Sequence, residues 1–418
     1  MKKSILVFCA LLVITLALAA CGNGGGGGAG AGDGPSGRVT VFFWDGNQVP
    51  AMENIMDLLE ETAPGVSVEL TQIPWGQYWP AIQIALASSN EPDVFWSHPV
   101  NSVEFVPAGL MEPLDYFIER DGIDMSIFPQ GSLDMFTFNG IRYGIPKDFD
   151  TIALFYNRSI FQAAGVATPD GTWSMDDLRD TAIALTSGST FGFVSQAWTQ
   201  GQVHPWALTF GGRTLTPDGT SFDVYTPENI ASLQWLYDSM FVHQFSPTGA
   251  AQLEIDPVDR FLAGNVAMIS TGAWNVGWFY DMLDADLGIA PLPVQMRPAS
   301  IISTVALSMS PRSENKDAAW EVLKLFTLEE SAPAQAMFAI PAINGTQHHW
   351  VNNFPSLNLQ VFIDAVEWAS PNPIPSVRAP EQQAIFDDAL QNIWLQTEDI
   401  ASALRRITEE TAAIAAAG

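Results

Sequence analysis

The chain has 418 residues and a formal net charge of −29, because 46 acidic residues face only 17 basic ones. Nucleic-acid binding needs a basic stripe along the phosphate backbone, so this charge argues against nucleic acid as a partner. With 47% hydrophobic residues and 14 tryptophans, the chain is able to bury large cores, and its length exceeds what one core usually supports. The composition therefore predicts a folded protein with two lobes.

The N-terminus resembles the export signal of a bacterial lipoprotein. Two lysines precede the apolar run Ile5–Leu18, which is too short for an ordinary membrane span. The run leads into Leu18-Ala19-Ala20-Cys21, which resembles a lipobox. The resemblance implies that residues 1–20 are a cleaved signal peptide and that Cys21 carries the lipid. The protein would then be extracytoplasmic and anchored to the outer face of the bacterial cell membrane.

Residues 21–37 contain the predicted lipidation site, Cys21, and a run of glycines, so we expect a flexible tether between the lipid and the folded body. Cys9, the other cysteine, lies within the cleaved segment. The mature chain therefore has no thiol left for a disulfide or a thiolate metal site. No cofactor and no metal site is predicted.

The folded body begins with alternating strands and helices. Strands are predicted at residues 39–44, 66–70 and 93–96, and helices at residues 52–59 and 75–89. This β-α-β-α-β order predicts a largely parallel sheet with right-handed crossovers. Ligands of such sheets lie beyond the carboxyl ends of the strands, where Trp44, Asp45 and His98 would fall.

A charged turn and an apolar strand meet in residues 144–165, around which the rest of the chain is organised. Thr151–Tyr156 is apolar on both faces, which is typical of a strand covered on both sides. Lys147, Asp148 and Asp150 come just before it, and charges beside a buried strand need water, one another or a ligand. The stretch is interpreted as a crossover between two lobes, with a solvated loop before the strand as the alternative.

The second half of the chain continues the α/β pattern. The predicted helix starts are Ser174 with Asp177 three residues later, Thr226-Pro227, and Asn315 as a helix cap. The predicted strands include residues 191–195 and 301–309, and residues 261–274 predict a helix end, a strand and a glycine-containing turn in order. A second α/β lobe is the economical interpretation.

Several short motifs follow one another along nearly all of the mature chain. They are Gly144-Ile145-Pro146, Leu154-Phe155-Tyr156-Asn157-Arg158, Phe161 to Gly165, Thr172-Trp173, Gly264 to Trp274, Ala290-Pro291-Leu292-Pro293 and Asp317 to Phe326. Each motif is weak alone. Their order and spacing together resemble the family 1 extracellular solute-binding proteins of ABC importers, the relatives of maltodextrin-binding protein.

The resemblance implies an α/β, type II periplasmic-binding-protein-like fold, with two lobes joined by hinge crossings and a ligand cleft between them. The N-terminal lobe would comprise residues 38–147 with 302–341, and the C-terminal lobe residues 148–301 with 344–418. The hinge crossings would lie near residues 146–151, 298–303 and 342–346. Two rigid lobes joined in this way close by rotation, and a ligand that contacts both lobes favours the closed form.

Aromatic rings and carboxylates at strand ends suit a carbohydrate, whose C–H face packs on tryptophan while its hydroxyls need acceptors and donors. The predicted stacking residues are Trp44, Trp198, Trp206 and Trp274, and the predicted polar ligand-binding residues are Asp45, His98, Asp148 and Asp150. Each tryptophan is expected to follow or interrupt a strand, with core packing as the alternative. Helix capping would explain His98 equally well, and Lys147 is able to pair with either neighbouring carboxylate.

The predicted function is a lipid-anchored, monomeric receptor that binds a carbohydrate, in particular an oligosaccharide, and delivers it to ABC permease subunits. Among relatives of this kind, polyol and glycerophosphodiester ligands remain alternatives, and a membrane sensor is an alternative partner. The rival class is an exported glycoside hydrolase, which needs two carboxylates at a defined separation. Neighbouring carboxylates such as Glu60-Glu61 lie on predicted helices, and the chain has no Gly-x-Ser-x-Gly or His-Glu-x-x-His motif. No catalytic residue is predicted.

Overall fold

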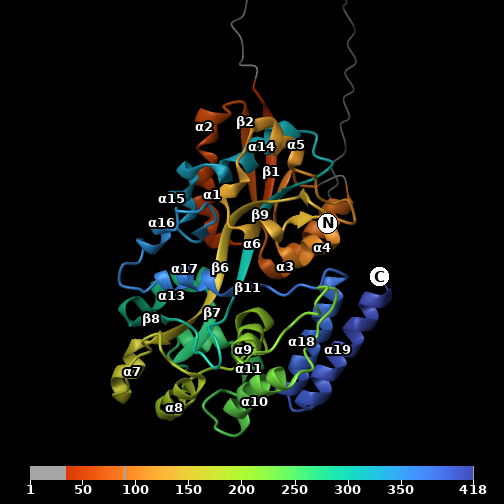
Figure 1. Cartoon of the computed structure of the whole chain (residues 1–418). Helices are drawn as coiled ribbons and strands as arrows, with labels where there is room; N and C mark the ends of the chain where they lie inside the picture. Colours follow the sequence, from red (N-terminus) through yellow and green to blue (C-terminus); the bar gives the residue numbers. More distant parts are fainter. Residues whose placement is uncertain (1–33, 89–90, 418) are drawn as a thin grey trace, which may run out of the picture. The chain divides into compact units, whose positions relative to one another are not determined.

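The computed structural model describes residues 34–88 and 91–417 of the chain. The predicted signal peptide (residues 1–20), the predicted lipidation site Cys21 and most of the predicted tether lie outside the described residues. The described residues from Pro35 onward form one compact unit, which is drawn in colour in Figure 1. Its first strand begins at Gly37, one residue before the predicted start of the folded body.

Within the described residues, the strands form mainly one nine-stranded sheet. Its strands are β1 (Gly37–Phe43), β2 (Val66–Gln72), β3 (Val94–Ser97), β6 (Ile145–Asn157), β7 (Met268–Gly272), β8 (Leu287–Ala290), β9 (Ser300–Met309), β10 (Ile340–Pro341) and β11 (Ala369–Pro371). The strand order is β10-β6-β9-β3-β1-β2, while β11 pairs with β9, and β7 and β8 pair with β6. A separate small sheet joins β4 (Thr137–Phe138) to β5 (Ile141–Arg142).

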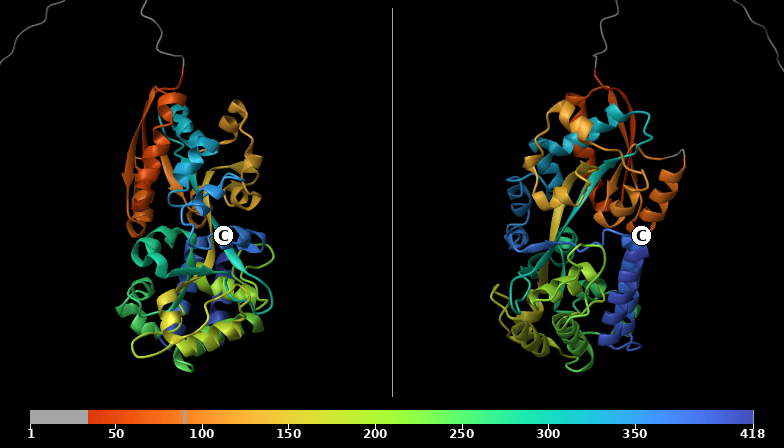
Figure 2. Two further views of the ribbon diagram at one scale, coloured as in Figure 1. Left: turned by 90° about the vertical axis from the view of Figure 1, so that its left-hand side faces the viewer. Right: turned by 45° about the vertical axis from the view of Figure 1, so that its right-hand side comes forward.

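Helices connect these strands and pack around them (Figures 1 and 2). In the first half of the chain they are α1 (Val49–Met56), α2 (Leu59–Thr62), α3 (Trp75–Ala87), α4 (Pro99–Phe105), α5 (Asp115–Asp121), α6 (Gln130–Asp134), α7 (Arg158–Ala164), α8 (Met175–Leu185) and α9 (His204–Thr209). The later ones are α10 (Pro227–Phe241), α11 (Gly249–Glu254), α12 (Pro257–Leu262), α13 (Val276–Leu283), α14 (Lys316–Lys324), α15 (Ala332–Gln335), α16 (His348–Val351), α17 (Gln360–Asp364), α18 (Ala379–Trp394) and α19 (Ile400–Ala417).

Shorter helical turns lie between these elements. The 3₁₀ turns are η1 (Gly46–Gln48), η2 (Met125–Ile127), η4 (Ala273–Asn275), η5 (Asp284–Asp286), η6 (Leu325–Thr327), η7 (Glu329–Ser331) and η8 (Ala365–Glu367), and a π-helical turn, η3, covers Thr199–Val203. Two of them, η1 and η4, directly follow strands β1 and β7 and are important for the candidate site.

The order of strands and helices predicted for the start of the folded body is confirmed. β1 pairs in parallel with β2, from Gly37 opposite Val66 to Phe43 opposite Gln72, and in parallel with β3 on its other side. Parallel pairing does not extend to the whole sheet, because β9 runs antiparallel to both β3 and β6. The sheet is mixed because β9, a strand from much later in the chain, lies between β3 and β6.

β6 is the long strand that joins the two parts of the sheet. Its first residues pair antiparallel with β9 and β10, and its residues from Ile152 onward pair antiparallel with β7 and β8. The register with β9 shifts between Pro146 and Asp148, where proline has no N–H to donate to the ladder. The predicted crossover segment is therefore one continuous strand. The alternative of a solvated loop is wrong, because Lys147 and Asp148 are buried.

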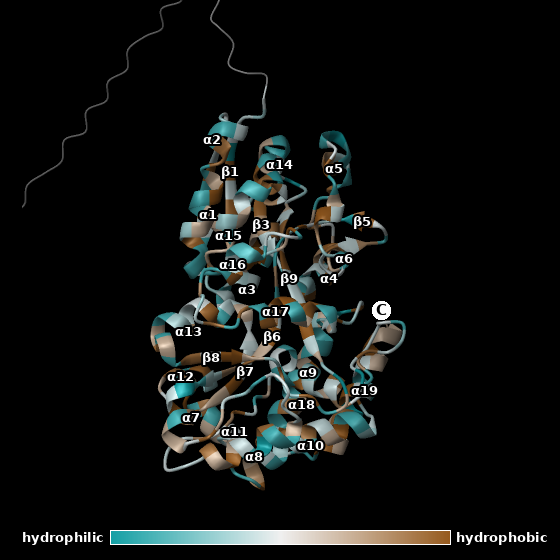
Figure 3. Ribbon diagram, turned by 60° about the vertical axis from the view of Figure 1, so that its left-hand side comes forward, coloured by the Kyte–Doolittle hydropathy of each residue, from teal (hydrophilic) through white to brown (hydrophobic). Residues whose placement is uncertain are grey.

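The apolar pattern of residues 151–156 correctly predicted burial on both faces. Every residue of β6 from Thr151 to Asn157 is buried, and so is every residue of β7 and β8. Figure 3 shows β7 and β8 as strongly hydrophobic strands. A strand with both faces covered is the expected structure for such a run.

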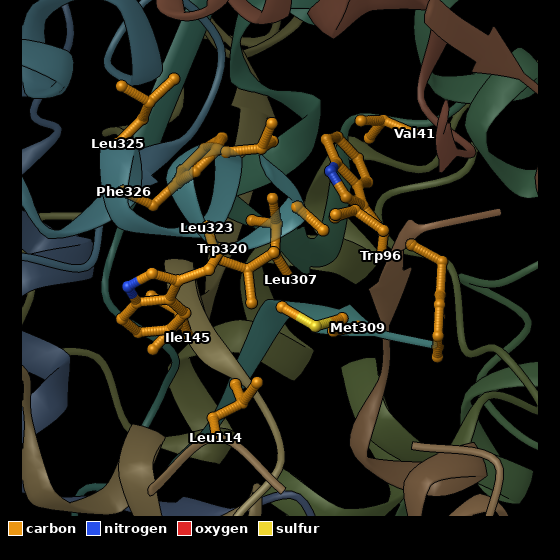
Figure 4. Packing of buried hydrophobic residues seen from close by; sticks show 14 of the residues in the cluster. Val41, Trp96, Leu114, Ile145, Leu307, Met309, Trp320, Leu323, Leu325 and Phe326 are labelled. Carbon is orange, nitrogen blue, oxygen red and sulfur yellow. The ribbon is translucent and has the colours of Figure 1, made fainter. Parts of the chain in front are cut away.

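Two hydrophobic cores lie in the two lobes. The core of the N-terminal lobe gathers buried residues between 39 and 145 and between 307 and 343, among them Trp96, Leu307 and Trp320 in Figure 4. The core of the C-terminal lobe gathers buried residues between 154 and 290 and between 386 and 407. A third cluster joins Phe149 and Ile302 of the linking strands to residues such as Phe362. The lobe boundaries proposed above stay predictions.

Local helix signals were predicted with mixed success. Ser174 and Asp177 form the predicted capping box of α8, with Asp177 N donating to Ser174 Oγ at 3.1 Å and Ser174 N donating to Asp177 Oδ2 at 2.8 Å. Thr226 caps α10 as predicted. Asn315 precedes α14 as predicted but makes no side-chain capping hydrogen bond, and its Nδ2 donates to Arg38 O at 3.3 Å.

The strand predicted at residues 191–195 is wrong. Phe191 forms only an isolated bridge with Val266, and the residues after it belong to no strand. The segment is apolar because it is buried, with Phe193 and Val194 fully inaccessible. Gly192 packs directly on α8, since a Cβ there would lie 1.9 Å from a backbone oxygen of that helix.

Candidate functional site

Aromatic rings gather around the carboxyl ends of β1, β2 and β3. This N-lobe aromatic group consists of Trp44, Trp75, Tyr78, Trp79 and Trp96. The ring centroid of Trp44 lies 5.1 Å from that of Trp75 and 5.1 Å from that of Trp96, edge to face in both pairs, which is a preferred geometry for aromatic pairs. The strand-end position predicted for Trp44 is correct, and it places the ring among four others.

The rings of this group differ in exposure. Tyr78 and Trp96 are fully buried, and Tyr78 Oη donates to Trp96 O at 2.7 Å. Burial raises the pKa of Tyr78 well above its ordinary value. Trp75 is 49% exposed and packs edge-on against Trp79 and His98, with centroid distances of 5.3 and 5.7 Å. Trp75 is therefore the ring of this group that presents most surface to a ligand.

A chain of hydrogen bonds runs from η1 to the start of β6, and we call its members, Asp45, Gln48, Lys147 and Asp148, the hinge network. Gln48 Nε2 donates to Asp45 Oδ2 at 3.0 Å, and Lys147 Nζ donates to Gln48 Oε1 at 2.9 Å and to Asp148 Oδ2. Lys147 Nζ also lies 4.2 Å from the Trp96 ring centroid, as a cation–π contact. Lys147 and Asp148 are only 3% and 6% exposed, so they form a buried ion pair.

The two carboxylates of the hinge network have further partners. Asp45 Oδ1 accepts from Asn47 N at 3.0 Å at the start of η1, and Asp148 Oδ1 accepts from Val305 N at 3.2 Å on β9. Asp148 thus joins β6 to β9, while Asp45 shapes the turn after β1. Both were predicted to bind ligand, and the structure gives both a positioning role whose effect on ligand binding stays a prediction.

Asp150 differs from these two carboxylates. It lies opposite Ser303 in the pairing of β6 with β9, and its Oδ1 is buried with no hydrogen-bond partner in the described part of the chain. Burial, and secondarily the charge of Asp148, raise the pKa of Asp150 well above its ordinary value, although Lys147 acts in the opposite sense. A buried carboxyl oxygen without a partner is an exception that calls for a function or a ligand.

His98 of the N-terminal lobe contacts Ser303, the serine that lies opposite Asp150. Its Nε2 lies 3.5 Å from Ser303 Oγ, and its Nδ1 accepts from Val100 N at 3.4 Å at the start of α4. The capping role expected as the alternative is therefore present. Burial lowers the pKa of His98 to about 4, so the ring is neutral at neutral pH. Because Nδ1 is the acceptor, the proton belongs on Nε2, which becomes a donor beside Ser303.

Trp198 and Trp274 form the C-lobe tryptophan pair. Their ring centroids are 5.9 Å apart at an interplanar angle of 77°, and Trp274 is 37% exposed. Two glycines make room for the rings: a Cβ at Gly201 would lie 1.7 Å from the Trp198 ring, and one at Gly272 would lie 1.9 Å from the Trp274 ring. Both ring positions therefore depend on the absence of a side chain in the same turn.

The C-lobe tryptophan pair lies next to the linking strands. Trp198 packs against a small cluster that includes Ile152 of β6 and Ile301 of β9. Gly272, which supports the Trp274 ring, pairs with Ile152 in the β6–β7 ladder. Ile152 follows Asp150 by two residues, so the pair and the free carboxyl oxygen belong to one region of the molecule.

Trp206 is not part of this region. It lies on α9, is 1% exposed, and its ring stacks on Phe193 with a centroid distance of 5.9 Å. The prediction that it follows or interrupts a strand is wrong, because Trp206 lies on a helix that follows the π-helical turn η3, and its ring belongs to the C-lobe core. The structure therefore supports the core-packing alternative for this tryptophan.

Sequence reasoning missed Trp75, Gln48 and Ser303, and it left the partner of Lys147 open. Trp75 lies just beyond the carboxyl end of β2, so the rule that singled out Trp44 would also have found it. Gln48 and Ser303 carry no such signal, because their partners come from distant segments. The structure resolves the question for Lys147, which pairs with Asp148.

The region combines exposed tryptophan rings, a free carboxyl oxygen and a neutral imidazole. Such a set binds a molecule that has flat apolar faces and hydroxyl groups. Across residues 34–88 and 91–417, no group of three or more His, Cys, Asp or Glu side chains is placed to hold a metal ion.

Of the helices in the described part of the chain, none combines the length and the apolar character needed to cross a bilayer.

Comparisons with known proteins identify similar molecules. The model of the family described as bacterial extracellular solute-binding protein matches residues 45–333. A binding protein of Brucella abortus is 25% identical over 295 residues, 68% of this chain and 70% of that protein. A maltotriose-binding protein of Pyrococcus abyssi is 25% identical over 306 residues, 70% of this chain and 63% of that protein.

The fold has close counterparts among solved structures. An ABC substrate-binding protein of Listeria monocytogenes, in complex with cycloalternan, matches with a TM-score of 0.82 and 20% identity over 90% of this chain and 97% of that one. This similarity confirms the predicted α/β, two-lobed type II fold.

Proposed function

Because this chain belongs to the family of bacterial extracellular solute-binding proteins, we propose that the solute it binds and delivers to an ABC permease is a carbohydrate, in particular an oligosaccharide. Members of this family are binding proteins, so the chain is not an enzyme and the exported glycoside hydrolase is set aside. The extracellular location follows from the family as well. The choice of carbohydrate rests on the site.

One observation carries that choice: exposed tryptophan rings from both lobes accompany a carboxyl oxygen that has no hydrogen-bond partner among the described residues. Trp75 of the N-terminal lobe is 49% exposed and Trp274 of the C-terminal lobe is 37% exposed. Asp150 lies on β6, the strand that links the two parts of the sheet. A pyranose packs its C–H face on such rings, and its hydroxyls donate to or accept from a carboxyl group.

The charges in this region favour a neutral ligand. The ammonium of Lys147 is already engaged by Asp148 and Gln48, so it offers little to a phosphate group. His98 is neutral near pH 7, because burial lowers its pKa to about 4. A glycerophosphodiester is therefore less well supported than a sugar.

Two of the similar proteins support the same ligand class. The Pyrococcus abyssi relative is named for maltotriose, and the Listeria monocytogenes structure holds cycloalternan. Both ligands are oligosaccharides. The share of sequence identity is too low to transfer a particular sugar or linkage to this chain.

In this proposal, two groups of side chains bind the ligand. The stacking residues are Trp44, Trp75, Trp198 and Trp274, and the polar ligand-binding residues are Asp45, His98, Asp148 and Asp150. Rotation of the lobes about the predicted hinge crossings would bring the two sets of rings onto one ligand. A ligand that touches both sets stabilises the closed form.

Lipidation of Cys21, removal of residues 1–20 and a monomeric state complete the proposal. A glycine-rich tether of this length would let the lipid-anchored body reach its permease above the membrane. Labelling cells with an alkyne fatty acid tests the anchor. The wild-type protein should be labelled in the membrane fraction, whereas Cys21→Ser should be unlabelled and soluble; equal labelling of both would refute lipidation at Cys21.

Calorimetry against malto-, arabino- and galacto-oligosaccharides, with polyols and glycerophosphodiesters as comparison ligands, tests the ligand class. The expected result is saturable binding of at least one oligosaccharide with no hydrolysis product. Trp274→Ala should weaken that binding at least tenfold. Trp206→Phe is the matched control and should leave it unchanged, because Trp206 is a core residue. Binding of a polyol or phosphodiester alone would overturn the carbohydrate.

A further inference from the structure

A row of exposed apolar side chains runs along η4 and α13. We call Trp274, Trp278 and Met282 the outer stripe; they are 37%, 44% and 60% exposed. Residues four apart lie on one face of a helix, and the opposite face of α13 is buried, with Val276 and Phe279 fully inaccessible in the core. The outer stripe is therefore a surface that the fold directs outward.

The outer stripe is continuous with the candidate site. Its first member, Trp274, is also a member of the C-lobe tryptophan pair, 5.9 Å from Trp198. Side chains at this spacing are neighbours about 5–6 Å apart on a helix surface. Because η4 and α13 are contiguous, Trp278 and Met282 follow Trp274 at intervals of about one helical turn, so the stripe extends from the candidate site along α13.

The charges beside the outer stripe restrict what it binds. Asp281 and Asp284 are exposed next to it, and residues 273–286 contain no lysine, arginine or histidine. An anionic membrane surface attracts basic side chains, so a lipid headgroup is a poor occupant. Carboxylates next to aromatic rings instead match the hydroxyls and C–H faces of a sugar.

We propose that Trp278 and Met282 form an outer subsite that holds the distal units of a long oligosaccharide, while its inner units occupy the site between the lobes. This inference rests on the proposed function and makes it more specific. The outer ring lies about one helical turn from Trp274, and the unbranched thioether of Met282 adapts its shape to the unit beyond. The preferred ligand is therefore longer than the inter-lobe site alone would select.

The experiment measures affinity against ligand length. Linear malto-, arabino- and galacto-oligosaccharides, from disaccharide to heptasaccharide, are titrated into the purified protein and into Trp278→Ala. In the series that binds, we expect wild-type affinity to rise with length. The substitution should weaken hexasaccharide binding about two- to tenfold and leave disaccharide binding unchanged. Trp278→Phe should restore part of the lost affinity.

Tyr116→Ala is the matched control, because Tyr116 is a 68% exposed aromatic residue on α5 of the N-terminal lobe. It should leave affinity unchanged at every length. An equal loss at all lengths, or no loss at any, would overturn the outer subsite. Wild-type sugar binding by Trp278→Ala combined with reduced permease-dependent uptake would overturn it in favour of a protein-docking surface.

Failure of the two proposals gives different results. If the wild-type protein binds no saccharide of any length, the proposed function is wrong and the outer subsite is wrong with it. If the wild-type protein binds saccharides and Trp278→Ala shows the same dependence on length, only the outer subsite is wrong.

Discussion

The two sides of the candidate site are built differently. In the N-terminal lobe, Trp44 contacts four other rings, and the adjoining ion pair of Lys147 and Asp148 is buried. In the C-terminal lobe, Trp274 meets Trp198 edge-on and keeps 37% of its surface exposed. Trp44 is integrated into a hydrophobic core, with the exposed Trp75 at the edge of the same aromatic group, whereas Trp274 is a partly exposed ring paired with Trp198.

This difference indicates a division of labour. Rings that pack on one another stabilise the fold and hold their positions before a ligand arrives, which reduces the entropy lost on binding. A half-exposed ring contributes little to stability and much of its surface to the ligand. Substitution of Trp44 should therefore change stability and binding together, whereas substitution of Trp274 should change mainly binding.

The largest expected effect comes from breaking the buried ion pair. Lys147→Met leaves Asp148 buried without its cation, which should lower the free energy of unfolding by about 3–5 kcal/mol. Urea denaturation measures this. Lys316→Met is the control, because Lys316 pairs with Glu112 at 2.9 Å near the surface and should cost no more than about 1 kcal/mol. Equal losses in the two variants would contradict a special role for the hinge network.

Tryptophan substitutions on the two sides test the comparison directly. Trp44→Ala removes a partly buried ring with four aromatic neighbours and should cost about 2–4 kcal/mol of unfolding free energy as well as affinity. Trp274→Ala should cost less than about 1 kcal/mol of stability while weakening sugar binding. Thermal unfolding and calorimetry on the same samples measure both quantities. If Trp274→Ala proves the more destabilising, the proposed division of labour is wrong.

Asp150→Asn should stabilise the protein at neutral pH while weakening ligand binding. Because the folded pKa of Asp150 is raised, the native state binds more protons than the unfolded state above the ordinary pKa, and stability falls as pH rises through that window. The substitution removes this loss and should raise the Tm by about 1–3 °C at pH 7.

The difference between Asp150→Asn and the wild-type protein should shrink as pH falls toward 3, because Asp150 is then protonated in both states. Calorimetric unfolding from pH 3 to pH 8 follows it. A lower Tm for the variant at pH 7 would show that Asp150 has a stabilising partner in solution.

The smallest expected effect at neutral pH concerns His98. Its folded pKa of about 4 lies below its ordinary value of 6.5, so the unfolded state binds more protons between these values. Stability should therefore fall as pH drops from 6.5 to 4. His98→Gln should remove part of this acid-dependent loss, whereas the exposed His348→Gln should not. His204, whose pKa burial lowers to about 3, accounts for a remaining slope in the same direction.

Much of the fold was predictable from local patterns. The apolar run in β6 predicted a strand buried on both faces, and Ser174 with Asp177 predicted the start of α8. These features depend on neighbours within a few residues, so the sequence contains the whole signal. The strand prediction at residues 191–195 was wrong because it also used only a local pattern. A short apolar run does not distinguish a strand from a buried irregular segment.

The candidate site was only partly predictable. Strand-end position correctly suggested Trp44 and would have found Trp75, but Trp206, which was expected to follow or interrupt a strand as well, lies in the core. Burial of a ring depends on elements far away in the chain: α9 is covered on every side, whereas η4 is not. No local pattern distinguishes these tryptophans.

By itself, the sequence determined the α/β character, the linking segment at residues 144–165 and the presence of three charged side chains beside it. Only the tertiary structure decided which of those charges are paired. Lys147 reaches Gln48 and Asp148, and Val305 N satisfies Asp148 Oδ1, while Asp150 Oδ1 has no hydrogen-bond partner in the part of the chain that the structure describes. The reason is physical: these partners come from η1 and β9, and a hydrogen bond depends on distance in space, which chain folding sets and sequence separation does not.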